Sequence, residues 1–548
     1  MRVQIHPLTR CFLILGFLLL ALPAIPAQGQ YAELGKVDFE NSGSPEAQEP
    51  FLKGVAALHS FWYGEARFLF QEAQAADPDF ALAYWGEAMT HDHPLWSGHD
   101  AEAGRKALEK LAPTPEERAA KAPTAREKAW LATVEALYGE GTRSERQQAY
   151  HQAVLHLANQ YPQDPEASAF YALTLQISPH SGLASVRHRM RSAAILERLM
   201  DTLPRHPGVL HYLIHAYDDP IHAPLGLRPA LVYAGVAPGS SHALHMPSHI
   251  FLQLGMWDSM VSSNEAAYVA SLAWAQRRDL PATERDFHSL GWLSYGYLQL
   301  GRTAEGKECV RLIQEVVDAS GDLDLAAEAQ RMEARYLVES GRWSEAPEAS
   351  AVSTDNPYSE ATMRLALALA AAYEQDAPAG AAAAARLEEL RAGREQEGNQ
   401  YLERLLAIME RQGAALAAVA AGNWEEALER GAEAARLAET TEPSSGPPET
   451  LKPAHELYGE LLWAAGRPAE AVEPFQRALE RAPNRVRSLL GLARAAVAQG
   501  DEAAAVAQYR QLLALWQQAD PDLPALGEAK AAVARAPSSE NPSSENSP

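Results

Sequence analysis

GELLWAAGRPAEAVEPFQRALERAP, residues 459–483, is the stretch that decides the fold of this chain. Four of its residues have counterparts 34 positions later: Gly466 and Gly500, Ala471 and Ala505, Phe475 and Tyr509, Ala478 and Leu512. Small residues at these places let two helices approach closely, and the aromatic side chain fills the hole between neighbouring helix pairs. The stretch therefore predicts a repeated pair of packed helices.

The same spacing occurs near the start of the chain, in Gly54, Ala66, Phe70, Ala73 and Pro78. This pattern resembles the tetratricopeptide repeat family, which has small residues at repeat positions 8, 20 and 27, an aromatic residue at 24 and proline at 32. The resemblance implies an all-α fold, a right-handed solenoid of helical hairpins. It also implies that the first helix of each hairpin lines a concave groove. Weaker copies of the turn between the two helices occur at Gly255, Gly301, Gly341 and Gly422.

Composition agrees with helices. Of the 548 residues 47% are hydrophobic, and long stretches are rich in Ala, Leu, Glu and Arg, which favour helix. The chain is too long for one simple core, so repeats or several domains are expected.

We predict a signal peptide at 1–29, a flexible segment at 30–44, a solenoid at 45–440, a linker at 441–453, a C-terminal repeat pair at 454–517, and a helix remnant with a disordered tail at 518–548.

The first 29 residues have the pattern of a targeting segment. Arg2 and Arg10 give a positive start, Cys11–Ala24 is an apolar run too short to span a bilayer comfortably, and Ala27-Gln28-Gly29 offers small residues for cleavage. The mature chain is therefore expected to be exported, periplasmic or secreted, with no membrane span.

Cleavage would lower the formal charge from −24 to −26, because residues 1–29 hold two arginines and no acid. Such a charge argues against nucleic acid or an anionic membrane as partner. Only Cys309 would remain, which excludes an internal disulfide and a cysteine-based metal site.

Histidines gather in the middle of the chain. His242, His245 and His249 are spaced i, i+3, i+7, so that they share one face of a helix, and His211 and His215 are spaced i, i+4 on the preceding candidate helix. By the resemblance, His211, His242 and also His288 fall at position 2 of three successive repeats, where their imidazoles would meet in the groove. Pro247 interrupts this stretch: either the helix kinks there, or a new helix begins there.

Stripes of imidazole suit a transition metal, and a donor set without thiolate favours copper or zinc. We predict metal ligation by His211, His215, His242, His245 and His249, with one or two ions. Asp218 or Asp219 would be an additional ligand, an orienting group or a general base. Met246 and Met256 nearby incline the choice toward copper.

Two main functions follow as hypotheses, and a metal-free enzyme or small-molecule binder is a third. In the first, the groove holds the metal centre and the protein is a carrier or a metal-dependent enzyme, an oxidoreductase or a hydrolase acting on a small-molecule substrate. In the second, the groove is an interaction scaffold that holds an extended peptide or an exported protein partner without metal. The metal content of the purified protein distinguishes the two.

Cleavage of the targeting segment should give a mature N-terminus near Gln30. N-terminal sequencing of the protein exported by its native host measures this, and soluble protein that retains Met1 would contradict it.

Overall fold

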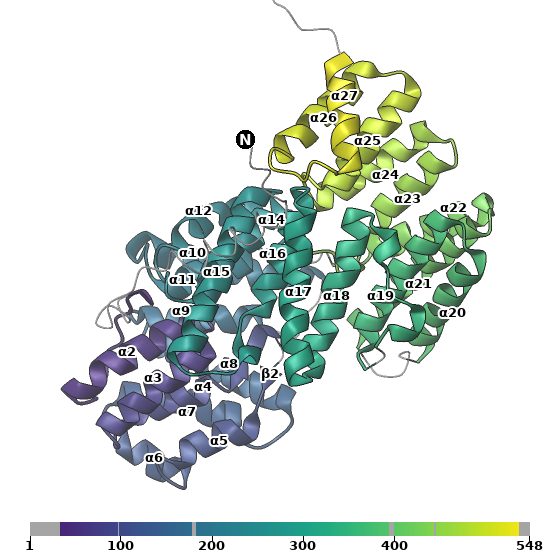
Figure 1. Ribbon diagram of the computed structural model, residues 1–548. Coiled ribbons are helices and arrows are strands. Elements are labelled where there is room, and N and C mark those ends of the chain that lie inside the picture. The colour runs from purple at the N-terminus through teal and green to yellow at the C-terminus, as the bar shows by residue number, and fades with distance from the viewer. Residues whose placement is uncertain are drawn as a thin grey trace, which may run out of the picture. The chain divides into compact units, whose positions relative to one another are not determined.

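The computed structural model of the protein consists of helices joined by short turns (Figure 1). It describes residues 33–96, 98–177, 182–353, 355–393, 399–442 and 445–535. The predicted signal peptide and the tail after residue 535 lie outside the described residues.

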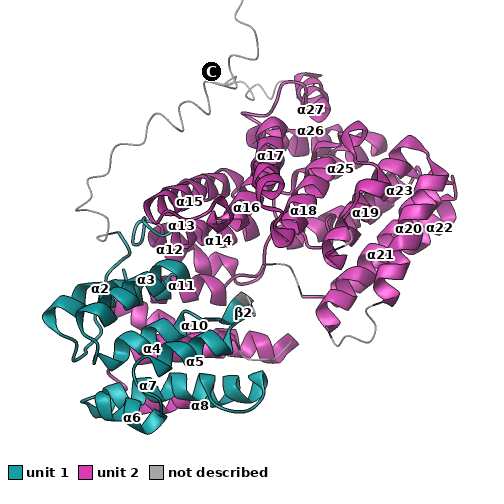
Figure 2. Cartoon of the chain, turned by 60° about the horizontal axis from the view of Figure 1, so that its bottom comes forward, with its two compact units in different colours: residues 1–150, 205–207, 235–240 teal, residues 151–204, 208–234, 241–548 magenta. Residues whose placement is uncertain are grey.

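Two compact units make up the chain (Figure 2). Unit 1 comprises residues 1–150, 205–207 and 235–240, and unit 2 the remainder. Within the described residues unit 1 contains α2 (Pro45–His59), α3 (Tyr63–Ala76), α4 (Ala81–Met89), β1 (Asp92–His93), η1 (Pro94–Trp96), β2 (Gly98–His99), α5 (Ala101–Glu109), α6 (Pro115–Lys121), α7 (Ala125–Tyr138) and the start of α8 (Arg143–Gln160).

Unit 2 continues the succession of helices. Its first part holds α9 (Pro165–Gln176), α10 (Gly182–Thr202), α11 (Pro207–Ala216), α12 (Ala223–Tyr233), α13 (Ser241–His245), α14 (Pro247–Gln253), α15 (Trp257–Arg277), η2 (Ala282–Glu284), α16 (Phe287–Gln299), α17 (Thr303–Ser320) and α18 (Leu323–Ser340). Its second part holds η3 (Trp343–Glu345), η4 (Ala349–Ala351), α19 (Pro357–Glu374), α20 (Ala377–Ala392), α21 (Gln400–Ala420), α22 (Trp424–Glu439), α23 (Ala454–Ala464), α24 (Pro468–Arg481), α25 (Val486–Gln499), α26 (Glu502–Leu515) and α27 (Pro524–Arg535).

The packing of small against aromatic residues occurs in both units. A Cβ atom on Gly54 or Gly86 would lie 2.8 or 2.3 Å from the ring of Phe70. In unit 2, a Cβ atom on Gly459 or Gly491 would lie 2.9 or 2.3 Å from the ring of Phe475. Such distances leave no room for a larger residue, so each ring fills the space between a hairpin and the next helix. The all-α solenoid of tetratricopeptide-like hairpins predicted from the sequence is confirmed.

The segment before α2 differs from the flexible one that we predicted. Residues 35–44 form neither helix nor strand, but Leu34, Val37 and Phe39 are buried. The ring of Phe39 lies 4.8 Å from Trp130 and 5.5 Å from Phe51, centroid to centroid. Apolar side chains therefore anchor this segment to the helices of unit 1.

Pro247 is the first residue of α14, and α13 ends two residues earlier. Of the two interpretations of this proline, the structure shows the helix start. A proline in the first turn loses no helical hydrogen bond, because the amide of that position has no partner within the helix. His242 and His245 lie on α13, and His249 lies on α14.

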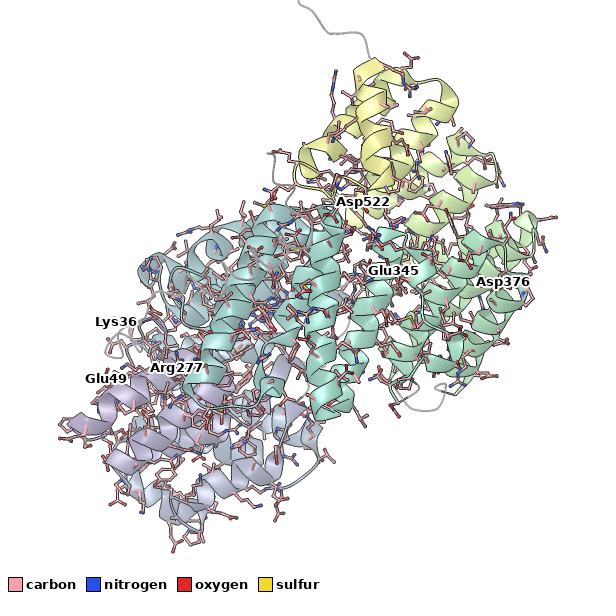
Figure 3. The ribbon with its side chains drawn as sticks, viewed as in Figure 1. Lys36, Glu49, Arg277, Glu345, Asp376 and Asp522 are labelled. Carbon is pink, nitrogen blue, oxygen red and sulfur yellow. The ribbon has the colours of Figure 1, made fainter. Side chains whose placement is uncertain are left out.

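The C-terminal repeats do not form a separate domain behind a linker. Gly255, with a left-handed φ of 65°, ends the turn before α15, and a Cβ atom there would lie 2.2 Å from the carbonyl oxygen of Pro483. The indole of Trp257 donates to the carbonyl of Asn484 at 2.9 Å. Figure 3 labels Asp522, which pairs with Arg342 at 2.9 Å where the C-terminal helices meet the centre of unit 2.

Arg485 is the buried centre of this contact. Its guanidinium donates to Glu456 and Glu339, both at 2.7 Å, and to the hydroxyl of Tyr295 at 2.7 Å. The three charged side chains are at most 1% exposed. One cation thus joins α23 and α25 to α16 and α18.

None of the helices that the structure describes combines the length and the apolar character needed to cross a membrane.

Arg485→Ala should lower the free energy of unfolding of unit 2 by about 3 kcal/mol, because it removes the nearest cation from two buried carboxylates. Lys452 still pairs with Glu456 at 2.9 Å, and Arg487 lies 3.6 Å from Glu339, so neither carboxylate is left without a counter-ion. Urea unfolding followed by circular dichroism measures the change.

Arg477→Ala is the matched control, since it removes only two exposed pairs on α24, with Glu473 and Glu480, and should leave the urea midpoint unchanged. Equal midpoints for both variants would contradict the role given to Arg485.

Candidate metal centre

Six histidines of unit 2 meet on the first helices of three successive hairpins. His211 and His215 come from α11, His242 and His245 from α13, His249 from α14, and His288 from α16. The structure therefore brings together all five histidines predicted as ligands, and it adds His288. The sequence pointed to His288 through one feature. It falls at position 2 of its repeat, as His211 and His242 do in theirs.

The first trio consists of His211, His215 and His242. The Nε2 atom of His211 lies 3.1 Å from Nε2 of His215 and 3.2 Å from Nε2 of His242. One ring nitrogen from each of the three lies within 4.8 Å of the others. His211 is fully buried, whereas His215 and His242 are half-buried.

The second trio consists of His245, His249 and His288, whose ring nitrogens also lie within 4.8 Å of one another. The Nε2 atoms of His245 and His249 are 3.1 Å apart. His245 is fully buried, His249 is 8% exposed, and His288 is exposed. Each trio therefore has a buried side and a side open to solvent.

The Nδ1 atoms of His245 and His249 are both hydrogen-bond donors. Nδ1 of His249 lies 2.6 Å from the carboxylate of Asp218, which only accepts. Nδ1 of His245 lies 2.6 Å from Oδ1 of Asn264 on α15. The amide nitrogen of Asn264 donates to the carbonyl of Met260 at 2.8 Å, which fixes the amide orientation, so its oxygen must accept from His245.

Of the two aspartates considered from the sequence, only Asp218 contacts the cluster. Gln253 also donates to Asp218, at 3.3 Å, so this carboxylate orients His249. Asp219 instead pairs with Arg189 at 2.8 Å and with His222 at 2.7 Å. The structure does not bring Asp219 into either trio.

Aromatic rings surround the imidazoles. The indole of Trp292 on α16 lies 4.4 Å from the ring of His249 and 4.9 Å from that of His245, and Tyr233 stacks on His211 at 5.4 Å, all between centroids. Trp292 also meets the segment that we predicted to be a linker. A Cβ atom on Gly446 would lie 2.8 Å from the indole.

Burial favours the neutral form of three of these imidazoles. Desolvation, and then the neighbouring histidines, lower the pKa values of His215, His242 and His245 well below 6.5. A neutral imidazole is the form that binds a metal ion.

The histidines of unit 1 near β1 and β2 are used differently. His93 lies 3.1 Å from the carbonyl of Thr90. His99 contacts Asp92 through Nδ1 at 2.8 Å and Arg146 through Nε2 at 3.1 Å. Since Arg146 can only donate, it occupies the lone pair of His99 that a metal would need.

Comparison with known proteins places the repeats in a family. Residues 462–533 match the tetratricopeptide repeat family, a segment that reaches into α27, beyond the pair that we predicted. No curated protein sequence matches the chain. A tetratricopeptide scaffold supports a role in binding.

Three solved structures are similar in fold. A human IFIT1 dimer with m7Gppp-AAAA is 12% identical, with a TM-score of 0.35 over 93% of this chain and 95% of that one. Yeast Tom70 is 11% identical, with a TM-score of 0.26 over 89% and 88%. The Cut9–Hcn1 hetero-tetramer of APC/C is 13% identical, with a TM-score of 0.31 over 89% and 90%.

Metal-free protein should lose stability as the pH falls below about 6.5. The unfolded chain has histidine pKa values near 6.5, whereas those of the folded cluster are lower, so the unfolded state binds more protons below that pH. Each such histidine lowers the free energy of unfolding by up to about 1.4 kcal/mol per pH unit. Urea unfolding at pH 7.5 and 5.0 measures the loss.

Two variants assign that loss to the cluster. His215→Gln should lose less stability than the parent between the two pH values, and His156→Gln, which changes an exposed residue, should lose as much as the parent. The comparison is needed because the pKa of His91 in unit 1, lowered to about 4 by burial, adds to the same dependence. Equal losses in the parent and in His215→Gln would show that His215 titrates normally in the fold.

Proposed function

We propose that this tetratricopeptide repeat protein binds a transition-metal ion, copper or zinc, through the histidines of α11, α13, α14 and α16. The donors are imidazoles alone, a set that suits these two metals. The thiol of Cys309 takes no part, because burial on α17 raises its pKa and keeps it protonated.

The pair of Nε2 atoms on His245 and His249 carries the proposal. Because both Nδ1 atoms donate elsewhere, a neutral ring in each case leaves a lone pair on Nε2. These two lone pairs lie 3.1 Å apart and repel each other unless a cation lies between them. A proton on His249, with Asp218 as its counter-ion, is the alternative to a metal ion, and the metal content of the purified protein distinguishes the two.

A metal ion fits the same separation. Two nitrogens bound at about 2.0–2.1 Å with a tetrahedral angle lie about 3.3 Å apart. The Nε2 distances within both trios, 3.1 and 3.2 Å, need little adjustment to reach that value.

The residues around the rings have defined tasks in this proposal. Asp218 and Asn264 hold His249 and His245 with Nε2 toward the ion, as hydrogen-bonded partners of metal-binding histidines commonly do. Trp292 covers one side of the second trio and excludes water there. An oxidoreductase or hydrolase would act beside His288, which is exposed. With the targeting segment expected at residues 1–29, we propose that the protein acts outside the cytoplasm.

Copper or zinc should raise the melting temperature of the metal-stripped protein. An ion bound only by the folded state stabilises it by RT ln(1 + [L]/Kd), about 2.7 kcal/mol at a hundredfold excess over Kd. His242→Ala/His249→Ala removes one ligand from each trio and should abolish the shift, with helical content unchanged. Differential scanning fluorimetry measures the shift, and circular dichroism the helical content.

His151→Ala/His156→Ala is the matched control, because these histidines lie on α8; its metal-induced shift should equal that of the parent. An equal shift in the His242→Ala/His249→Ala variant would place the binding site elsewhere. A parent that contains no metal and melts independently of metal would favour the interaction scaffold.

A further inference from the structure

We propose that the cluster is a two-metal centre, with one ion in each trio. This inference rests on the proposed function, and it extends the ligand set from the five predicted histidines to six. Each trio supplies three nitrogens, the number of protein ligands that catalytic zinc sites use while a fourth position stays open. A single ion would leave several of the six imidazoles unused.

Ring spacing separates the six histidines into these two sets. A metal at about 2.0–2.1 Å from Nε2 lies about 3.2 Å from the ring centroid, so two rings on one ion at angles of about 95–110° have centroids about 4.7–5.2 Å apart. Within the first trio the two measured centroid separations from His211 are 4.8 and 5.0 Å. Within the second trio those from His245 are 5.0 and 4.7 Å.

Between the trios the separations are longer. The rings of His215 and His249 are 5.8 Å apart, and those of His242 and His245 are 5.9 Å apart. Rings from different trios thus exceed the spacing expected around a shared ion, but they are in contact. Two ions held in these sets would be near neighbours, as in two-metal sites, where the ions are about 3.5–4 Å apart.

Nearby carboxylates distinguish the two sets. Asp218 accepts a hydrogen bond from His249, and the charges of Asp286 and Glu328 act on His288, where that of Arg335 opposes them. A carboxylate partner raises the basicity of a metal-binding imidazole, and negative charge offsets that of the ion. The second trio should therefore bind its ion more tightly and fill first.

Metal stoichiometry of the full chain tests the proposal. Protein dialysed against buffered Zn²⁺ should contain two ions per chain by mass spectrometry of the metal. His215→Ala, which damages only the first trio, and His288→Ala, which damages only the second, should each contain one. Both residues have exposed surface, so neither change empties a closed core. His156→Ala should retain two ions.

Titration separates the two variants further. His215→Ala should keep the tighter binding step and lose the weaker one, and His288→Ala should do the reverse, as measured by isothermal calorimetry. In the Cu²⁺-loaded parent, electron paramagnetic resonance should show the broadened spectrum of two neighbouring spins, and each variant the narrow spectrum of an isolated ion.

The alternative results are distinct. One ion in the parent would overturn the two-metal centre and leave the proposed function intact. Two ions in the parent and in both variants would place the ions outside the trios and overturn it as well. A parent without metal would overturn the proposed function itself.

Discussion

The space between a glycine and a phenylalanine ring sets the spacing of the helices in this protein. A Cβ atom on Gly86 or Gly491 would lie 2.3 Å from Phe70 or Phe475, so these rings fit only because the facing residue has no side chain. The histidine-bearing hairpins approach as closely with aliphatic partners: a Cβ atom on Gly226 would lie 2.5 Å from Ile250, and one on Gly296 would lie 2.8 Å from Val261. Imidazoles from α11, α13, α14 and α16 can then reach one another, although they belong to three different hairpins.

The sequence predictions that the structure confirms rest on the spacing of residues within single stretches of the chain. The small and aromatic residues recur at fixed intervals, so the helical hairpins could be predicted from single stretches. The five histidines could be predicted to lie together because i, i+3, i+4 and i+7 spacings place side chains on one face of a helix. His288 was recognised only as a shared repeat position, since its approach to His245 depends on how α16 packs against α13.

Partners from distant segments could not be predicted. Asn264 lies on α15, and nothing in its own stretch shows that it would fix the tautomer of His245. Arg485 has the sequence of an ordinary helix start, yet it binds carboxylates on α18 and α23. The buried segment at Phe39 was missed for a related reason: it has no periodicity, and its apolar residues pack only against helices that come later in the chain.

Through Gly446, the loop before α23 contacts a residue that packs against the histidine cluster. Surface loops usually absorb insertions, deletions and larger side chains without consequence. Here a Cβ atom on Gly446 would lie 2.8 Å from the indole of Trp292, and the centroid of that ring is 4.4 Å from that of His249. The conformational freedom of an imidazole is therefore limited by a loop that holds no ligand. Sequence changes in this loop can therefore alter the rigidity of the histidine cluster without replacing a histidine.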